Sequence, residues 1–156
     1  MTKTIASLPA WVAFGFLVIP FVIGSSLFYG TILAIAAYFI WIYSLGVEAY
    51  HSLPEGMAMP IKKFKLAVIY FAGYGTIASI SFTTIMPYAI PFHIFAMFCI
   101  LYSFYYVAKA IRTIELNRIA KFEDWFAVFF GMWFFPIGVW FIQRKIRRII
   151  ATPPNV

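Results

Sequence analysis

No charged residue occurs between Lys3 and Glu48, and this long uncharged stretch leaves the chain few possible folds. Its apolar part, WVAFGFLVIPFVIGSSLFYGTILAIAAYFIWIYSLG, would be roughly 54 Å long as one helix at about 1.5 Å per residue. The hydrocarbon core of a bilayer is only about 30 Å thick, so one straight spanning helix does not fit. Gly24–Ser26, with Gly30 behind it, offers a turn. The sequence therefore predicts two spanning helices, 8–25 and 28–47, joined as a tight hairpin.

The composition agrees with a membrane environment. The chain is 64% hydrophobic and 11% charged, whereas soluble domains average about 45–50% apolar and about 25% charged residues. Twelve basic and five acidic residues give a formal charge of +7. The basic residues cluster just beyond the apolar runs, where they orient helices and meet anionic lipid, so we expect the bilayer rather than nucleic acid as the partner. The single cysteine excludes an intrachain disulfide and a Cys-based zinc site.

The middle of the chain predicts two further spans. The polar loop from Glu48 to Lys65 is interrupted by prolines and leads into a third span at 65–86. Pro87–Pro91 is long enough only for a turn, so a fourth span at 91–109 returns to the starting side.

A charged segment and a last apolar run complete the chain. The segment Lys109–Asp124 carries both signs of charge and predicts a helical extension at the membrane interface, with the Arg112–Glu115 and Glu115–Arg118 pairs at i,i+3 spacing. The run at 125–142 follows it. The predicted fold is an all-α integral membrane helical bundle in one domain, 1–156, with about four transmembrane helices and a C-terminal re-entrant, in-plane or fifth spanning segment.

The distribution of positive charge predicts the orientation. Cytoplasmic loops of membrane proteins carry an excess of Lys and Arg. If the first apolar stretch is a hairpin, Lys3 and both polar loops lie on one side, and the uncharged turns at 24–27 and 87–91 lie on the other. We therefore expect a cytoplasmic N-terminus.

The same rule bears on the last apolar run. A spanning helix would carry its basic tail outside, whereas a return at Pro136–Gly138 keeps the tail inside, and proline and glycine both weaken a helix there. We favour the re-entrant or in-plane arrangement, and the spanning helix remains the alternative. Two basic groups are expected to meet anionic lipid: Lys62, Lys63 and Lys65 in the first polar loop, and Arg144, Lys145, Arg147 and Arg148 in the tail.

Few residues suggest reaction chemistry. Glu48 and His51 have the Glu-x-x-His spacing of di-metal helical bundles, but such sites need several of these pairs, so both are only weak metal candidates. His93, at the predicted outer turn, is expected to bond to backbone or headgroup. We predict no catalytic residue, metal or cofactor. An intramembrane enzyme using Glu48, His51 and Glu55 is the least favoured interpretation.

The third predicted span carries small and hydroxylated residues at helical spacing. Gly75, Ser79 and Thr83 recur every four residues, a pattern that lets helix backbones approach closely. A polar strip lining a narrow aqueous path is the alternative, although such hydroxyls can also bond to their own helix carbonyls. The residues assigned to helix packing or to a path are Gly73, Gly75, Ser79, Ser81, Thr83 and Thr84.

The C-terminal third resembles small bacterial polytopic membrane proteins of uncharacterised function. The shared features are a charged linker after an aromatic-rich helix, here Glu115–Asp124, and a WFFPIG-W-IQ ending, here Trp133–Gln143. Such proteins often have proline after the glutamine, where this chain has Arg144. The resemblance implies a bacterial inner membrane and brings no activity.

Two functions follow as expectations. The first is a non-enzymatic membrane protein acting as a subunit, assembly partner or homo-oligomeric module of an inner-membrane complex, with other membrane subunits or its own copies as partners. The alternative is a small oligomeric channel, transporter or membrane-perturbing effector whose path is lined by the hydroxyls of the third span.

Overall fold

The structure, a computed structural model, describes residues 1–24, 28–134 and 137–151. Within these ranges the side chains of residues 21, 23, 24, 28–31 and 80–88 are not described. All secondary structure in the described part is helical, as predicted. The helices are α1 (Thr2–Ala6), α2 (Ala10–Gly24), α3 (Phe28–His51), α4 (Ile61–Leu116), α5 (Phe122–Trp133) and α6 (Ile137–Ala151).

Two segments of the described chain are long and apolar enough to cross a membrane, Ile32–His51 in α3 and Ala89–Leu116 in α4. A shorter apolar helix covers Ala10–Pro20. The coarse prediction of an apolar helical bundle is therefore confirmed.

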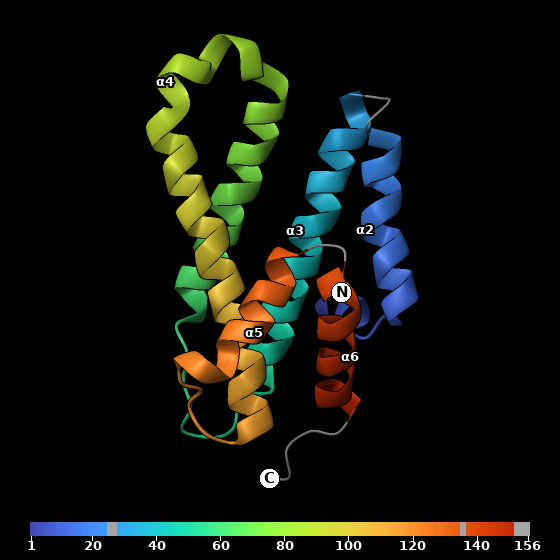
Figure 1. The fold of residues 1–156 in the computed structure, drawn as a ribbon, viewed down its shortest axis with the longest axis vertical. Coiled ribbons are helices and arrows are strands. Elements are labelled where there is room, and N and C mark those ends of the chain that lie inside the picture. Colours follow the sequence, from blue (N-terminus) through green and yellow to red (C-terminus); the bar gives the residue numbers. More distant parts are fainter. Residues whose placement is uncertain (25–27, 135–136, 152–156) are drawn as a thin grey trace.

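Helices α2 and α3 lie side by side and run in opposite directions, as expected of a hairpin (Figure 1). Their bounds are close to the predicted 8–25 and 28–47, and α3 continues four residues further, to His51. Of the predicted turn, residues 25–27 lie outside the described residues. The short helix α1 precedes the hairpin and was not predicted.

The prediction of two helices separated by a turn at 87–91 is wrong, because α4 is helical through these residues. The backbone is helical from Ile61 to Leu116, and the ribbon turns over at its top so that the two halves run antiparallel (Figure 1). Their aromatic rings meet along the way: Phe64 stacks on Tyr106 with centroids 4.5 Å apart, and Tyr70 meets Phe95 edge-on at 4.7 Å. Proline removes only its own backbone donor and can kink a helix instead of ending it.

The last apolar run forms two helices, as the favoured return near Pro136–Gly138 predicts, and not one helix over 125–142. Helix α5 ends at Trp133, and α6 starts at Ile137 and continues through the basic tail to Ala151. Residues 135 and 136, and with them Pro136, lie outside the described residues. Helices α5 and α6 pack against each other as a hairpin that stays in the lower half of the molecule (Figure 1).

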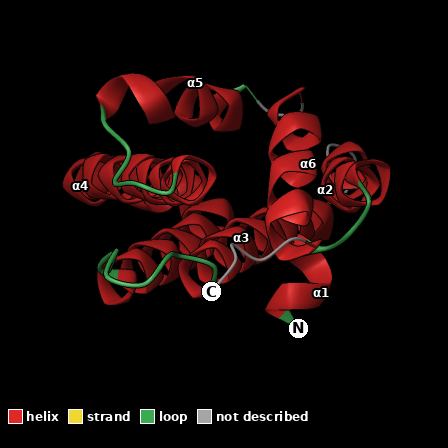
Figure 2. Cartoon of the chain, turned by 90° about the horizontal axis from the view of Figure 1, so that it is seen from below, coloured by secondary structure: helices red, strands yellow, loops and turns green. Residues whose placement is uncertain are grey.

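The core lies in that lower half. Viewed from below, α4 lies between α5 and α3, and α6 packs on α5, α2, α3 and α1 (Figure 2). Two glycines allow close packing: a side chain at Gly46 on α3 would collide with the Phe64 ring on α4, and one at Gly138 on α6 would collide with the Gly131 carbonyl on α5. The largest fully buried side chains include Trp41, Ile42, Leu45, Phe64, Tyr106, Ile111, Met132, Ile142, Gln143 and Ile146.

Candidate functional site: the polar end of the bundle

The charged segments gather at one end of the molecule. The loops 52–60 and 117–121 and the end of α6 lie at the lower end in Figure 1, whereas the α4 bend and the adjoining ends of α2 and α3 lie at the upper end. An ion pair joins Lys145 Nζ of α6 to Glu115 Oε1 near the end of α4, at 2.5 Å. Arg112 pairs with the other oxygen of Glu115, as its i,i+3 spacing predicted. The basic tail therefore lies beside the charged end of α4.

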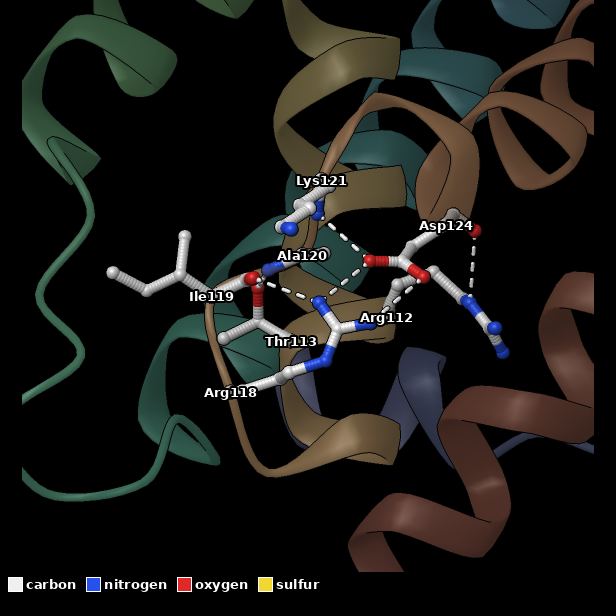
Figure 3. A network of polar contacts seen from close by, with 7 residues as sticks. All are labelled: Arg112, Thr113, Arg118, Ile119, Ala120, Lys121 and Asp124. Carbon is white, nitrogen blue, oxygen red and sulfur yellow. Dashed lines mark hydrogen bonds and ion pairs between the residues drawn. The ribbon is translucent and has the colours of Figure 1, made fainter.

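The corner between α4 and α5 is fixed by Asp124 (Figure 3). Arg118 donates to both carboxylate oxygens of Asp124, at 2.9 and 3.1 Å, instead of pairing with Glu115 as its spacing suggested. The backbone N–H of Lys121 donates to the same carboxylate at 2.8 Å, and Arg112 Nε donates to the Asp124 carbonyl at 2.9 Å. The bond from Lys121, followed by that from Arg118, holds the pKa of Asp124 below its usual value. Asn117 ends α4 with a left-handed φ of 49°.

Gln143 is a buried polar residue that was not among the predicted site residues. It is 0% exposed and lies on the buried side of α6 with Val139, Ile142 and Ile146. Its Oε1 accepts from Trp41 Nε1 on α3 at 2.9 Å. Its Nε2 donates to three backbone carbonyls at the end of α1 and just beyond it: Ile5, Ala6 and Leu8. The available sequence signal was a glutamine at an apolar position of an otherwise amphipathic helix.

The predicted basic residues fall into two separate places. Lys62, Lys63 and Lys65 lie in the first turns of α4, and Lys63 lines a cavity described below. Arg144, Arg147 and Arg148 are exposed on α6 and line an open hollow of about 410 Å³ with Ser7, Ile150 and Ala151. The two groups do not meet in one site, and their contact with anionic lipid stays a prediction.

A second cavity lies between the first polar loop and the descending half of α4. Its volume is about 340 Å³. Three tyrosines, two lysines and a threonine supply its polar side chains, and methionines and an isoleucine supply the apolar part of its wall. The lining residues are Met57, Ala58, Met59, Pro60, Lys63, Tyr102, Tyr105, Tyr106, Lys109, Thr113 and Ile119.

The small and hydroxylated residues predicted for helix packing or for a path do not all lie on one face of α4. A Cβ at Gly75 would lie 3.6 Å from Ile35 Cγ2 of α3, in ordinary contact, so Gly75 faces the protein's own hairpin. A Cβ at Gly73 would meet nothing within 4 Å. Ser79 Oγ donates to the Gly75 carbonyl at 2.7 Å, the helix back-bond foreseen for such hydroxyls. The side chains of the other predicted members, Ser81, Thr83 and Thr84, lie outside the described residues.

The weak metal candidates have structural contacts. Thr2 Oγ1 donates to Glu48 Oε1 at 2.6 Å and ties α1 to α3, while His51 is exposed and its ring meets Tyr50. In the part of the chain that the structure describes, no three His, Cys, Asp or Glu residues gather as a metal site would need. His93 Nδ1 lies 3.2 Å from Tyr74 Oη and links the two halves of α4.

Comparison with known proteins identifies no relative: the chain matches no protein-family model, no curated protein and no solved structure.

Proposed function

We propose that this chain is a non-enzymatic integral membrane protein of a bacterial inner membrane, acting as an assembly module that packs against copies of itself or other subunits. In this proposal α2, α3 and the two halves of α4 cross the bilayer. Helices α5 and α6 enter from the cytoplasmic side and return to it. The gathering of loops 52–60 and 117–121 and the basic tail at one end supports this orientation.

The outward face of the ascending half of α4 carries the assembly proposal. Leu66, Ile69 and Ile77 are 67%, 63% and 59% exposed. Gly73 lies between them in the same three-to-four-residue spacing, with open space in front of it. In a bilayer such a face meets lipid or another helix. A glycine flanked by branched apolar side chains favours contact with another helix over contact with lipid. The two backbones can approach closely there, and this gives packing that lipid chains do not supply.

The hydroxyls of this half support packing over an aqueous path. Thr76 donates to the Ala72 carbonyl at 2.9 Å, and Ser79 donates to the Gly75 carbonyl. A hydroxyl bonded to its own helix is satisfied without water. These two hydroxyls therefore give the channel alternative no support, and a measurement of ion flux through the purified particle would test it.

The test compares Gly73→Leu with Gly75→Leu. The mass of the purified particle is measured in nanodiscs together with its thermal unfolding. We expect the wild-type protein to be an oligomer or a stoichiometric complex. Gly73→Leu should dissociate it while the chain's own melting temperature stays unchanged, because the added side chain enters open space.

Gly75→Leu is the matched control, because its side chain crowds Ile35 within the chain. It should lower the melting temperature of the chain itself. A monomeric wild-type particle, or an assembly that Gly73→Leu leaves intact, would contradict the proposal. A discrete ring that conducts ions would replace it with the channel function.

A further inference from the structure

We propose that the cavity between residues 57–60 and the descending half of α4 binds a phosphate-bearing anion, of the kind presented by an anionic phospholipid headgroup. It is called the tyrosine cavity below and is lined by the residues given above. Its walls come from three segments: the first polar loop, α4, and the loop that follows α4. Because the lining residues fall in two stretches of the chain, 57–63 and 102–119, that only folding brings together, the site exists only in the folded chain.

The charge of the tyrosine cavity selects an anion. Lys63 and Lys109 line it, and no acidic side chain is among its lining residues. Lys109 Nζ donates to Tyr105 Oη at 2.9 Å and lies 5.4 Å from the centroid of that ring, so the ammonium is positioned by the aromatic wall. An ammonium has three N–H donors, and this contact uses one of them.

Tyr106 provides a second, independent observation. The residue is 0% exposed, and its hydroxyl is the one buried side-chain polar atom in the described part of the chain for which no partner is found. Its ring is held by stacking on Phe64, with centroids 4.5 Å apart and planes 19° apart. Buried hydroxyls nearly always have a hydrogen-bond partner, and Tyr106 lines the cavity, so its hydroxyl is available to donate to a water molecule or an anion that enters.

Together these groups match a phosphate ester. Two ammonium groups and phenolic donors suit the several acceptor oxygens of a phosphate. Met57, Met59 and Ile119 supply an apolar wall that suits the glycerol and acyl carbons next to a lipid phosphate. The cavity lies at the polar end of the bundle, which is headgroup depth if the helices span the bilayer. The inference that the phosphate belongs to a lipid therefore rests on the proposed function, in which the helices span the bilayer.

The test is native mass spectrometry of the full chain in a neutral detergent, with equal amounts of phosphatidylglycerol and phosphatidylcholine. We expect one phosphatidylglycerol to be retained in preference to phosphatidylcholine. The double variant Lys63→Met with Lys109→Met keeps the apolar stems and should reduce that preference about tenfold, as loss of charge-assisted hydrogen bonds would. Tyr106→Phe keeps the stacked ring and should reduce it by a smaller factor.

The matched control is Arg147→Met with Arg148→Met, which removes the same net charge from the other hollow. It should leave the preference unchanged. No preference in the wild-type protein, or a preference lost in the arginine variant and kept in the lysine variant, would overturn the proposal.

Competition with glycerol phosphate distinguishes the source of the phosphate. Resistance to a large excess supports a lipid ligand, and displacement supports a soluble phosphate ester at the same site. If a monomeric particle retains phosphatidylglycerol, this inference stands while the assembly proposal is contradicted. The two proposals can therefore be overturned independently.

Discussion

At the scale of the residue, Gln143 connects three helices through one side chain. Replacing it by leucine keeps the volume but removes the acceptor of the Trp41 N–H and the side-chain donor to the Ala6 carbonyl at the end of α1. Each buried polar group left unsatisfied costs about 1–3 kcal/mol. We expect Gln143→Leu to destabilise the protein by about 2–3 kcal/mol in thermal or denaturant unfolding in detergent.

The neighbouring substitution Arg144→Leu is the control, because Arg144 is exposed and should change stability little. A double-mutant cycle with Trp41→Phe isolates the indole contact. Since the two groups bond directly, the combined loss should be smaller than the sum of the single losses. Strict additivity would show that this hydrogen bond does not contribute as described.

Asp124 gives the corner between α4 and α5 a predictable pH dependence. Its pKa is lowered in the folded protein, so its contribution to stability is fully present above the ordinary aspartate value of about 3.9. That contribution is lost as the pH falls through the lowered pKa. We expect Asp124→Asn to melt below the wild-type protein at neutral pH, and the difference to vanish in acid. A difference that stays constant with pH would contradict this account.

At the scale of the element, the packing of α5 against α6 requires a glycine at position 138 but not at position 131. A methyl group at Gly138 would collide with the backbone of Gly131, whereas one at Gly131 meets nothing within 4 Å. Gly138→Ala should therefore force the helices apart and cost about 1–3 kcal/mol. Gly131→Ala should be neutral or stabilising by up to about 1 kcal/mol, because alanine is the better helix former. Unfolding of both variants checks this, and equal effects would contradict the packing.

The elements that the sequence predicted well are those set by local chemistry. The uncharged stretch is too long for one span and has a glycine and two serines in its interior, and these two features predicted the α2–α3 hairpin. Proline and glycine predicted a break in the last apolar run. Local chemistry did not predict that α4 stays helical past Pro91, because the penalty of a proline depends on the bend that the neighbouring segments allow. It also missed Gln143 and the tyrosine cavity, whose partners are brought together only by tertiary packing.

At the scale of the whole molecule, the two ends have different compositions and different packing. The lower end holds the buried core, the ion pairs of Glu115 and Asp124, and the tyrosine cavity. The upper part extends as two helical hairpins, α2–α3 and the two halves of α4 (Figure 1). This division follows from the solvent that each part meets in the proposed orientation. Hydrocarbon satisfies exposed apolar side chains, whereas ions need water, headgroups or partners.

The orientation leads to a labelling prediction that separates a re-entrant hairpin from a fifth span. In a Cys99→Ala background, single cysteines replace Glu55 in the first polar loop, Arg147 on α6, or Ile90 near the α4 bend, each exposed in the structure. A membrane-impermeant maleimide is applied to right-side-out and inverted vesicles. Because α6 returns beside the end of α4, where Lys145 pairs with Glu115, positions 55 and 147 should react from the same side. Position 90 should react from the opposite side. Labelling of position 147 together with position 90 would mean that the last apolar run crosses the bilayer and that the packed α5–α6 hairpin is not its membrane arrangement.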